Sequence, residues 1–352
     1  MITRAAPRPT SPSEADRYVQ YVEGPERAFE EAVRRAGAID KVYRIAGRLL
    51  RVRFAGETLV PLLSPALGHA SVSAAEEPAL TACVWDPQAI GVRLPEPPWG
   101  SEGQLPGGRV VRNWNGVELA FLADGEINVL DRNRRLAFHS PGVARELSSI
   151  PLLTIIHWWM SEHNLYCVHA GAVGLESGGV LLVGRGGAGK STATLSCLQS
   201  RLGYVADDFC LLSAGSAPQA YSLYSSAKLE PTQIPKLPFL LRPDGKQRYS
   251  FGKAIVFLAC DFPEKLLPGF PLRAVLVPKI TGRTDTAATR VSPAEAIKAL
   301  APSTLFILSG SGQPGLAAMA RLVRSVPCYR LEVGTDLATI PKAIEDILRI
   351  SQ

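Results

Sequence analysis

Residues 184–191 read Gly-Arg-Gly-Gly-Ala-Gly-Lys-Ser and are followed by Thr192. This stretch fits Gly-x-x-x-x-Gly-Lys-Ser/Thr, a loop that binds the phosphates of nucleotides. Glycines let backbone N–H groups curve around phosphate oxygens, Lys190 can reach the β- and γ-phosphates, and the Ser191 hydroxyl can ligate Mg²⁺. The predicted nucleotide-binding residues of this loop are Gly184, Gly186, Gly187, Ala188, Gly189, Lys190, Ser191 and Thr192.

The segments on either side of the loop support this interpretation. Residues 180–183 are a short apolar run that is typical of a buried strand. The residues after the loop place Leu195 and Leu198 on one face of a helix. A strand, a glycine-rich turn and a helix in this order are the context in which the motif binds phosphate, which argues against a chance match.

Two adjacent carboxylates, Asp207 and Asp208, follow soon after the loop. A strand over 204–206 would leave both at its carboxyl end, where ligands bind in open α/β sheets. One carboxylate can hold Mg²⁺ while the other accepts the proton of an attacking hydroxyl. We assign the proton to Asp207 and the metal to Asp208 together with Ser191. The reverse assignment and a solvated Asp-Asp turn remain the alternatives.

A histidine and a second lysine are further candidates. His169 lies in an alternating apolar segment, 166–173, and a turn at 176–179 would fold that segment against the strand before the loop. This hairpin predicts that His169 approaches the phosphates, where it can tune the pKa of Asp207 or contact the γ-phosphate; a half-buried structural histidine is the alternative. Lys228 can steady phosphate oxygens or be an ordinary solvated lysine.

Three segments in this order carry a resemblance to a known family: Val-His-Ala-Gly-Ala at 168–172, the loop at 184–191, and Val-Ala-Asp-Asp at 205–208. Together they resemble the catalytic domain of the bacterial HPr serine kinase/phosphorylase family. The resemblance covers residues 165–212 and extends more weakly to the C-terminus. It implies an α/β P-loop kinase domain of the HPr kinase type, ATP and Mg²⁺ as cofactors, and transfer of phosphate to a serine hydroxyl with one aspartate as base.

The chain departs from the bifunctional enzymes of that family in two places. Their downstream signature, linked to the phosphorylase reaction, is replaced by Tyr-Ser-Ser-Ala-Lys-Leu-Glu-Pro at 224–231. Residues 1–140 do not resemble their usual N-terminal domain. The chain is more similar to stand-alone HPr-kinase-like proteins, such as the kinases that phosphorylate a serine of lasso-type precursor peptides. The resemblance therefore implies a peptide or small protein with an acceptor serine.

Two function classes compete for this sequence. The first is a kinase, for which a small molecule such as free serine is the alternative acceptor. The second is a nucleotide-dependent switch that binds nucleotide and hydrolyses it slowly. The adjacent Asp207 and Asp208 favour the kinase, because a switch needs a water-positioning residue and mobile loops, and the sequence offers no clear candidates for either.

Length and composition are those of a globular protein of two domains. The 352 residues are 46% hydrophobic and 20% charged. The sequence lacks an apolar run that could span a membrane and an apolar signal core, so we expect a cytoplasmic protein with no membrane partner. Six scattered cysteines form no zinc pattern and favour reduced, buried thiols. The net charge of +6 suits an acidic peptide or nucleotide, but no basic run is interleaved with aromatics, so we expect no nucleic acid partner.

Patterning divides the chain into a β-rich accessory region, residues 1–140, and the P-loop domain, residues 141–352. We expect the first region to recognise the substrate, and we leave self-association of the chain open. The elements predicted outside the site are helices at 26–36, 142–163, 293–300, 315–326 and 340–350, hairpins near 42–54 and 116–130, strands at 272–280 and 328–333, and loops at 85–108 and 231–268.

Overall fold

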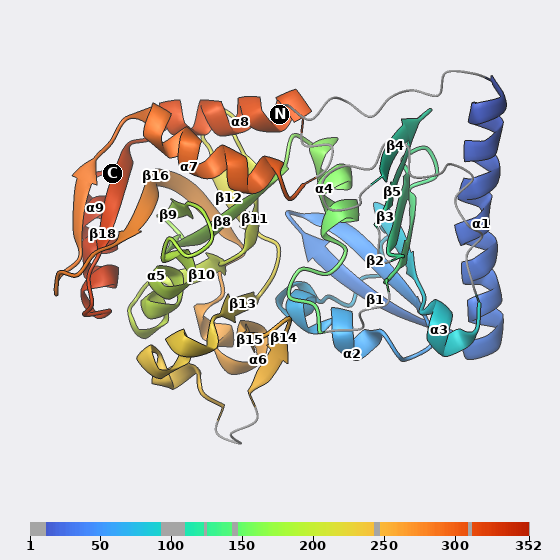
Figure 1. Ribbon diagram of the computed structural model, residues 1–352, viewed down its shortest axis with the longest axis horizontal. Coiled ribbons are helices and arrows are strands. Elements are labelled where there is room, and N and C mark those ends of the chain that lie inside the picture. Colours follow the sequence, from blue (N-terminus) through green and yellow to red (C-terminus); the bar gives the residue numbers. More distant parts are fainter. Residues whose placement is uncertain are drawn as a thin grey trace. The chain divides into compact units, whose positions relative to one another are not determined.

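The computed structural model describes residues 12–92, 110–122, 125–142, 147–242, 247–308 and 312–351. The chain divides into two compact units (Figure 1). Both combine helices with strands, so the fold is a mixed α/β fold with several sheets. The domain boundary predicted after residue 140 stays a prediction. The first unit comprises Met1–Ser64, Ala70–Leu147 and Leu152–Trp159, and the second comprises Pro65–His69, Ser148–Pro151 and Met160–Gln352.

A sheet of seven described strands forms the first unit, in the order β1-β2-β3-β7-β6-β5-β4. β3 is parallel to both of its neighbours, and the other pairs are antiparallel. The two predicted hairpins are confirmed as β1–β2 and β5–β6, whereas β3, β4 and β7 were not predicted. The strands are β1 (Ala38–Ile45), β2 (Arg48–Ala55), β3 (Leu80–Val84), β4 (Val110–Trp114), β5 (Val117–Phe121), β6 (Ile127–Asp131) and β7 (Leu136–Ser140).

Helix α1 (Pro12–Ala36) packs against this sheet and is longer than the predicted helix at 26–36. The Phe29 ring lies edge-on to the Trp85 ring, with 6.2 Å between the ring centroids. Pro25 indicates a helix start, because proline lacks the N–H that an interior helical position donates. The helix instead continues through Pro25, since burial of its apolar face in the core outweighs one missing hydrogen bond.

Two predictions for the neighbouring segments need correction. The described helix within 142–163 is only α4 (Leu153–Ser161), because Leu152 has a φ of +57°, which a right-handed helix does not accommodate. The predicted loop at 85–108 contains a short helix, α3 (Pro87–Ile90), which Asp86 caps by accepting two backbone N–H groups. Most of that loop lies outside the described residues.

The main sheet of the second unit has eight described strands in the order β10-β8-β11-β12-β16-β18-β17, with β9 paired to both β8 and β16. β8 and β9 form the predicted antiparallel hairpin, and β9, β16 and β18 run parallel to one another. The strands are β8 (Tyr166–Leu175), β9 (Gly178–Val183), β10 (Gly203–Ala206), β11 (Phe209–Ser213), β12 (Gln219–Ser222), β16 (Gly269–Ile280), β17 (Ala287–Arg290) and β18 (Cys328–Val333).

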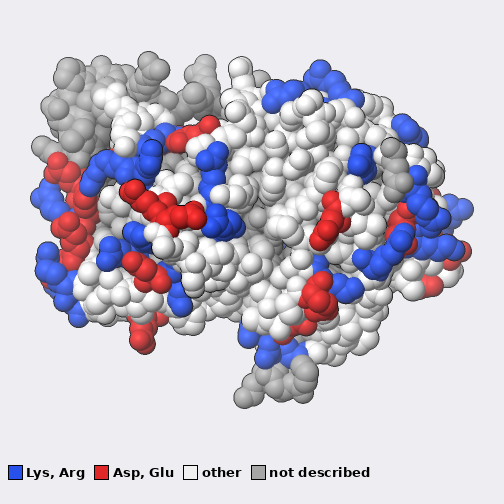
Figure 2. Space-filling model, turned by 180° about the vertical axis from the view of Figure 1, so that it is seen from behind, with Lys and Arg blue, Asp and Glu red and all other residues white. Residues whose placement is uncertain are grey.

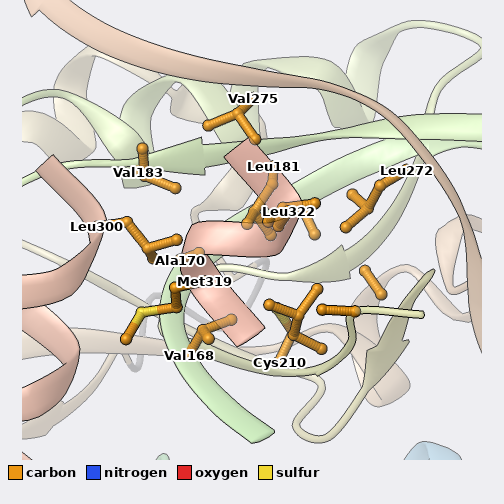
Figure 3. Packing of buried hydrophobic residues seen from close by; sticks show 14 of the residues in the cluster. Val168, Ala170, Leu181, Val183, Cys210, Leu272, Val275, Leu300, Met319 and Leu322 are labelled. Atoms are coloured by element: carbon orange, nitrogen blue, oxygen red, sulfur yellow. The ribbon is translucent and has the colours of Figure 1, made fainter. Parts of the chain in front are cut away.

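Helices cover both faces of this sheet because its central strands are apolar on both sides. Leu181 and Val183 of β9 pack in one cluster with α7 (Pro293–Leu305) and α8 (Gly312–Ser325), as Figure 3 shows. The alternate residues of β9 pack in a second cluster with α5 (Lys190–Ser196) and α9 (Thr339–Ile350). The bounds of the C-terminal helices and of β18 agree with the predicted bounds within a few residues, except that α7 extends beyond residue 300.

Truncation of Leu322 in α8 is expected to lower the free energy of unfolding by about 2–5 kcal/mol, because the side chain is fully buried and leaves a cavity. The matched control is Leu316→Ala on the same helix, since that side chain is 40% exposed. Urea unfolding followed by circular dichroism measures both variants. Equal losses from the two substitutions would contradict the packing of α8 on this sheet.

A separate three-stranded antiparallel sheet lies beside α6 (Leu258–Asp261), in the order β13-β15-β14 (Figure 1). Its strands are β13 (Ser226–Leu229), β14 (Arg248–Ser250) and β15 (Lys253–Phe257). The hydroxyl of Tyr204 in β10 donates to the Ser226 carbonyl at 2.8 Å, which ties this sheet to the main one. The segment predicted as a loop at 231–268 thus includes a β-hairpin, because its alternating residues pair with a neighbouring strand that local patterning does not reveal.

None of the described helices is both long and apolar enough to span a bilayer. All six cysteines of the sequence lie in the described ranges and are free thiols. Five are buried, and burial raises the pKa of Cys210 to about 12; Cys260 is exposed.

Candidate functional site

The predicted phosphate loop connects the end of β9 to the start of α5, and its shape depends on glycine. Gly187 and Gly189 have φ values of +79° and +98°, a backbone region that other residues rarely adopt. A Cβ at Gly189 would also lie 3.2 Å from Cγ1 of Ile280. The structure therefore explains Gly187 by its backbone geometry, and Gly189 by its backbone geometry and its close packing.

The side chain of Lys190 folds back over this loop. Its Nζ donates to the carbonyl oxygens of Gly184 at 2.7 Å and Arg185 at 3.3 Å, and the residue is only 6% exposed. Burial lowers the pKa of Lys190, while the charges of Asp207 and Asp208 act in the opposite direction. The ammonium group is thus held against the backbone of the loop.

Asp207 follows β10 directly and is 2% exposed. Its Oδ2 accepts the backbone N–H of Lys228 at 3.3 Å. Burial, and next the charge of Asp208, raise the pKa of Asp207 to about 7, against the lowering effects of Ser191, Lys228 and Lys190. A carboxyl with such a pKa exchanges its proton near neutral pH.

Asp208 is held by two basic side chains. Its Oδ1 lies 3.1 Å from Nε2 of His169, and its Oδ2 lies 3.1 Å from Nζ of Lys228. Burial raises the pKa of Asp208, but the hydrogen bonds and charges of His169 and Lys228 outweigh burial, so this pKa falls well below its usual range. The two neighbouring carboxyls therefore differ strongly in their affinity for protons.

The pairing of β8 with β11 positions His169. His169 is directly opposite Phe209 in the strand register, and the two rings stack with 5.1 Å between their centroids. The backbone N–H of His169 donates to Oγ1 of Thr304 at 3.1 Å. The ring is thus held by Phe209 and Asp208, and the contact with helix α7 holds the backbone of His169.

The structure brings the predicted residues together but differs from the expected pairings in two respects. His169 contacts Asp208, whereas it was expected to act on Asp207 or the phosphates. Ser191 lies beside Asp207, the aspartate that was not assigned to the metal. Thr192 is half-buried in the first turn of α5. The catalytic, nucleotide and metal roles of all these residues stay predictions.

Two residues at the site were missed. Thr304 and Lys253 lie far from the motif in the sequence, on α7 and β15. The charge of Lys253 contributes to the lowered pKa of Lys190. Neither residue belongs to a local pattern, so a long-range pairing signal would have been needed to find them.

The donor set near the loop fits a magnesium ion that is shared with phosphates. Within the described ranges, no group of three or more His, Cys, Asp or Glu could hold a metal ion without further ligands. Magnesium bound with a nucleotide needs only one or two carboxylates, a hydroxyl and waters, because the phosphates complete its shell. Ser191 and the two aspartates offer these groups, and Oδ1 of Asp207 is buried without a hydrogen-bond partner among the described residues.

Comparisons with known proteins assign this chain to no family. No protein-family model matches the chain, and no curated protein matches it. The HPr(Ser) kinase/phosphatase from Coxiella burnetii is a similar solved structure at 10% sequence identity; the match covers 52% of this chain and 94% of that chain, with a TM-score of 0.27. A likeness at this level carries no argument about activity.

Proposed function

We propose that this protein is a phosphotransferase that uses ATP and Mg²⁺ to phosphorylate a serine hydroxyl of a peptide or small protein. The proposal depends on one observation: Lys190 of the loop lies near Asp207 and Asp208, and the pKa values of these two carboxyls are shifted in opposite directions. When the surroundings of two neighbouring carboxyls shift their pKa values in opposite directions, one carboxyl can take up a proton while the other stays ionised. The serine acceptor rests on the resemblance of three sequence segments to HPr serine kinases.

In this mechanism each residue has a distinct task. The loop glycines and Lys190 bind the phosphates, and Lys190 stabilises charge on the group in transfer. Asp207 accepts the proton of the acceptor hydroxyl, for which a pKa near neutrality is suited. Ser191 and Asp208 would hold Mg²⁺, which neutralises phosphate charge when bound. His169 and Lys228 keep Asp208 ionised and oriented.

One observation favours the exchanged roles of the two aspartates. Ser191 lies beside Asp207, so this aspartate and the loop hydroxyl could hold the metal together. Asp208 is then the base, although its low pKa makes it a weaker proton acceptor. We retain Asp207 as the base and test the alternative by substitution.

The proposal also covers substrate recognition and the cellular compartment of the protein. We propose that the N-terminal region contributes to substrate recognition, since phosphate chemistry alone requires no such region. Free thiols fit a protein of the cytoplasm.

Mass spectrometry of candidate serine peptides incubated with the protein, ATP and Mg²⁺ tests this function. We expect a gain of one phosphoryl group on one serine, and no gain when that serine is replaced by alanine. Free serine is incubated in parallel. A gain on free serine alone would favour the small-molecule kinase, and ATP hydrolysis without any phosphorylated acceptor would favour the switch.

A further inference from the structure

The small sheet β13-β15-β14 gathers three basic side chains on one face. Lys228 of β13 and Arg248 of β14 are each paired with Ile255 of β15, from opposite sides. Directly opposed residues of antiparallel strands project to the same face, as do alternate residues along one strand. Lys253, two positions before Ile255, therefore projects to this face too. We call Lys228, Arg248 and Lys253 the basic face.

The three cations differ in what they already bind. Lys228 is paired with Asp208. Lys253 contacts Glu230 at 2.8 Å, but these two side chains are 48% and 58% exposed, so water screens the pair. Arg248 lies over the ring of Phe257 at 5.3 Å, and no carboxylate of the described residues forms an ion pair with it. Two cations of the basic face are thus available to an anion from outside.

The basic face borders the proposed site of phosphoryl transfer. Lys228 connects directly to Asp208 through its ammonium group and to Asp207 through its backbone N–H. Lys253 is near enough to Lys190 to influence the titration of that lysine. A ligand on the basic face would therefore lie next to the two carboxyls.

The hairpin that carries Arg248 and Lys253 also exposes aromatic side chains. Tyr249 is 54% exposed and Phe251, in the turn, is 75% exposed. Phe251 and Gly252 have φ values of +47° and +76°, the conformation of a tight two-residue hairpin turn. Tyr249 alternates with Arg248 and so projects to the opposite face, which leaves Phe251 at the turn as the apolar side chain that a ligand of the basic face can reach.

Acidic groups accompany the basic face, because Asp208 pairs with Lys228 and Glu230 pairs with Lys253. On the side of the molecule that Figure 2 shows, lysines and arginines are interspersed with acidic residues and separated by large uncharged areas. A nucleic acid or an anionic membrane needs an extended basic surface. A short acidic segment of a peptide needs only a few cations, and the Glu230 carboxylate already shows how Lys253 receives such a group.

We propose that the β14–β15 hairpin and the basic face bind the acceptor peptide, with Lys253 and Arg248 contacting acidic residues next to its serine and Phe251 contacting an apolar one. This inference rests on the proposed function and names its substrate class, an acidic serine peptide. An incoming carboxylate replaces Glu230 at Lys253, which places the neighbouring serine toward Asp207.

Fluorescence anisotropy with the full-length protein and no nucleotide tests the proposal. The probes are three fluorescein-labelled peptides with one serine and one leucine, flanked by glutamates, glutamines or lysines. We expect the glutamate peptide to bind about tenfold or more tightly than the glutamine peptide, with affinity falling as salt rises. Because no ATP is present, binding is scored independently of phosphoryl transfer, so failure of the kinase reaction and failure of docking are distinguishable.

Charge reversal locates the contact. Lys253→Glu with Arg248→Glu is expected to remove preferential binding of the glutamate peptide and to favour the lysine peptide. Lys253→Gln is the milder variant, and Lys236→Glu, an exposed lysine on the same unit, is the matched control that retains binding. The proposal is overturned if no peptide binds, if glutamate and glutamine peptides bind equally, if charge reversal has no effect, or if a labelled single-stranded DNA or anionic vesicle binds the basic face more tightly.

Discussion

Replacing Lys190 with alanine is expected to weaken binding of ATP with Mg²⁺ by about 10- to 100-fold, the usual effect of losing a charged hydrogen-bond donor. Lys190 is the lysine whose ammonium group spans the loop carbonyls, and burial has already removed much of its hydration. Isothermal titration calorimetry of the wild type and the variant measures the effect.

The matched control is Lys298→Ala, which removes an exposed lysine from α7 of the same unit. This control is expected to bind ATP as the wild type does. If Lys190→Ala and the wild type bound ATP equally, the loop at 184–191 would not be the nucleotide site.

Replacing Asp207 with asparagine is expected to lower phosphoryl transfer by about 10²-fold or more, the usual contribution of a positioned base, while ATP binding persists. Asparagine has nearly the same shape, so the buried position is filled in both proteins. Asp208→Asn is the companion variant. If Asp207→Asn turned over normally and Asp208→Asn were inactive, the two roles would be exchanged; full activity of both would rule out the mechanism.

The pH dependence gives the Asp207 substitution a second signature. The pKa of Asp207 is about 7, so turnover of the wild type is expected to rise as the pH rises through this value and the carboxyl loses its proton. Asp207→Asn should lack this rise. The free energy of unfolding changes with pH in the opposite direction. The raised pKa of Asp207 means that the folded state binds this proton more tightly than the unfolded state does. The resulting stabilisation is complete below about pH 4 and is lost as the pH rises through about 7.

Local sequence patterns predicted the parts of this protein that depend on neighbouring residues. Short periodicities and turn residues predicted the turn of the glycine-rich loop, the β8–β9 hairpin and β18 (Cys328–Val333). Pairings between distant segments had no such signal. The hairpin of β14 and β15 lies in a segment rich in Pro, and Lys253 reaches the site only because β15 pairs with β13.

In the candidate site, too, local sequence patterns predicted some features, whereas others depend on the pairing of distant strands. The motif predicted that Lys190 and the two aspartates lie together, because one strand and one helix separate them along the chain. Which aspartate receives His169 depends on the register of β8 against β11, and a shift of one residue would turn His169 to the other side of the sheet. Sequence alone does not specify that register.

Because only one of its six thiols is exposed, this protein has a natural site for labelling with a spectroscopic probe. A maleimide dye added to the folded wild type is expected to react at Cys260 alone, because the other five sulfurs are shielded from solvent. Cys260 lies in α6, which begins directly after β15 ends. A fluorophore attached there would report occupancy of the neighbouring hairpin in real time, without any engineered cysteine.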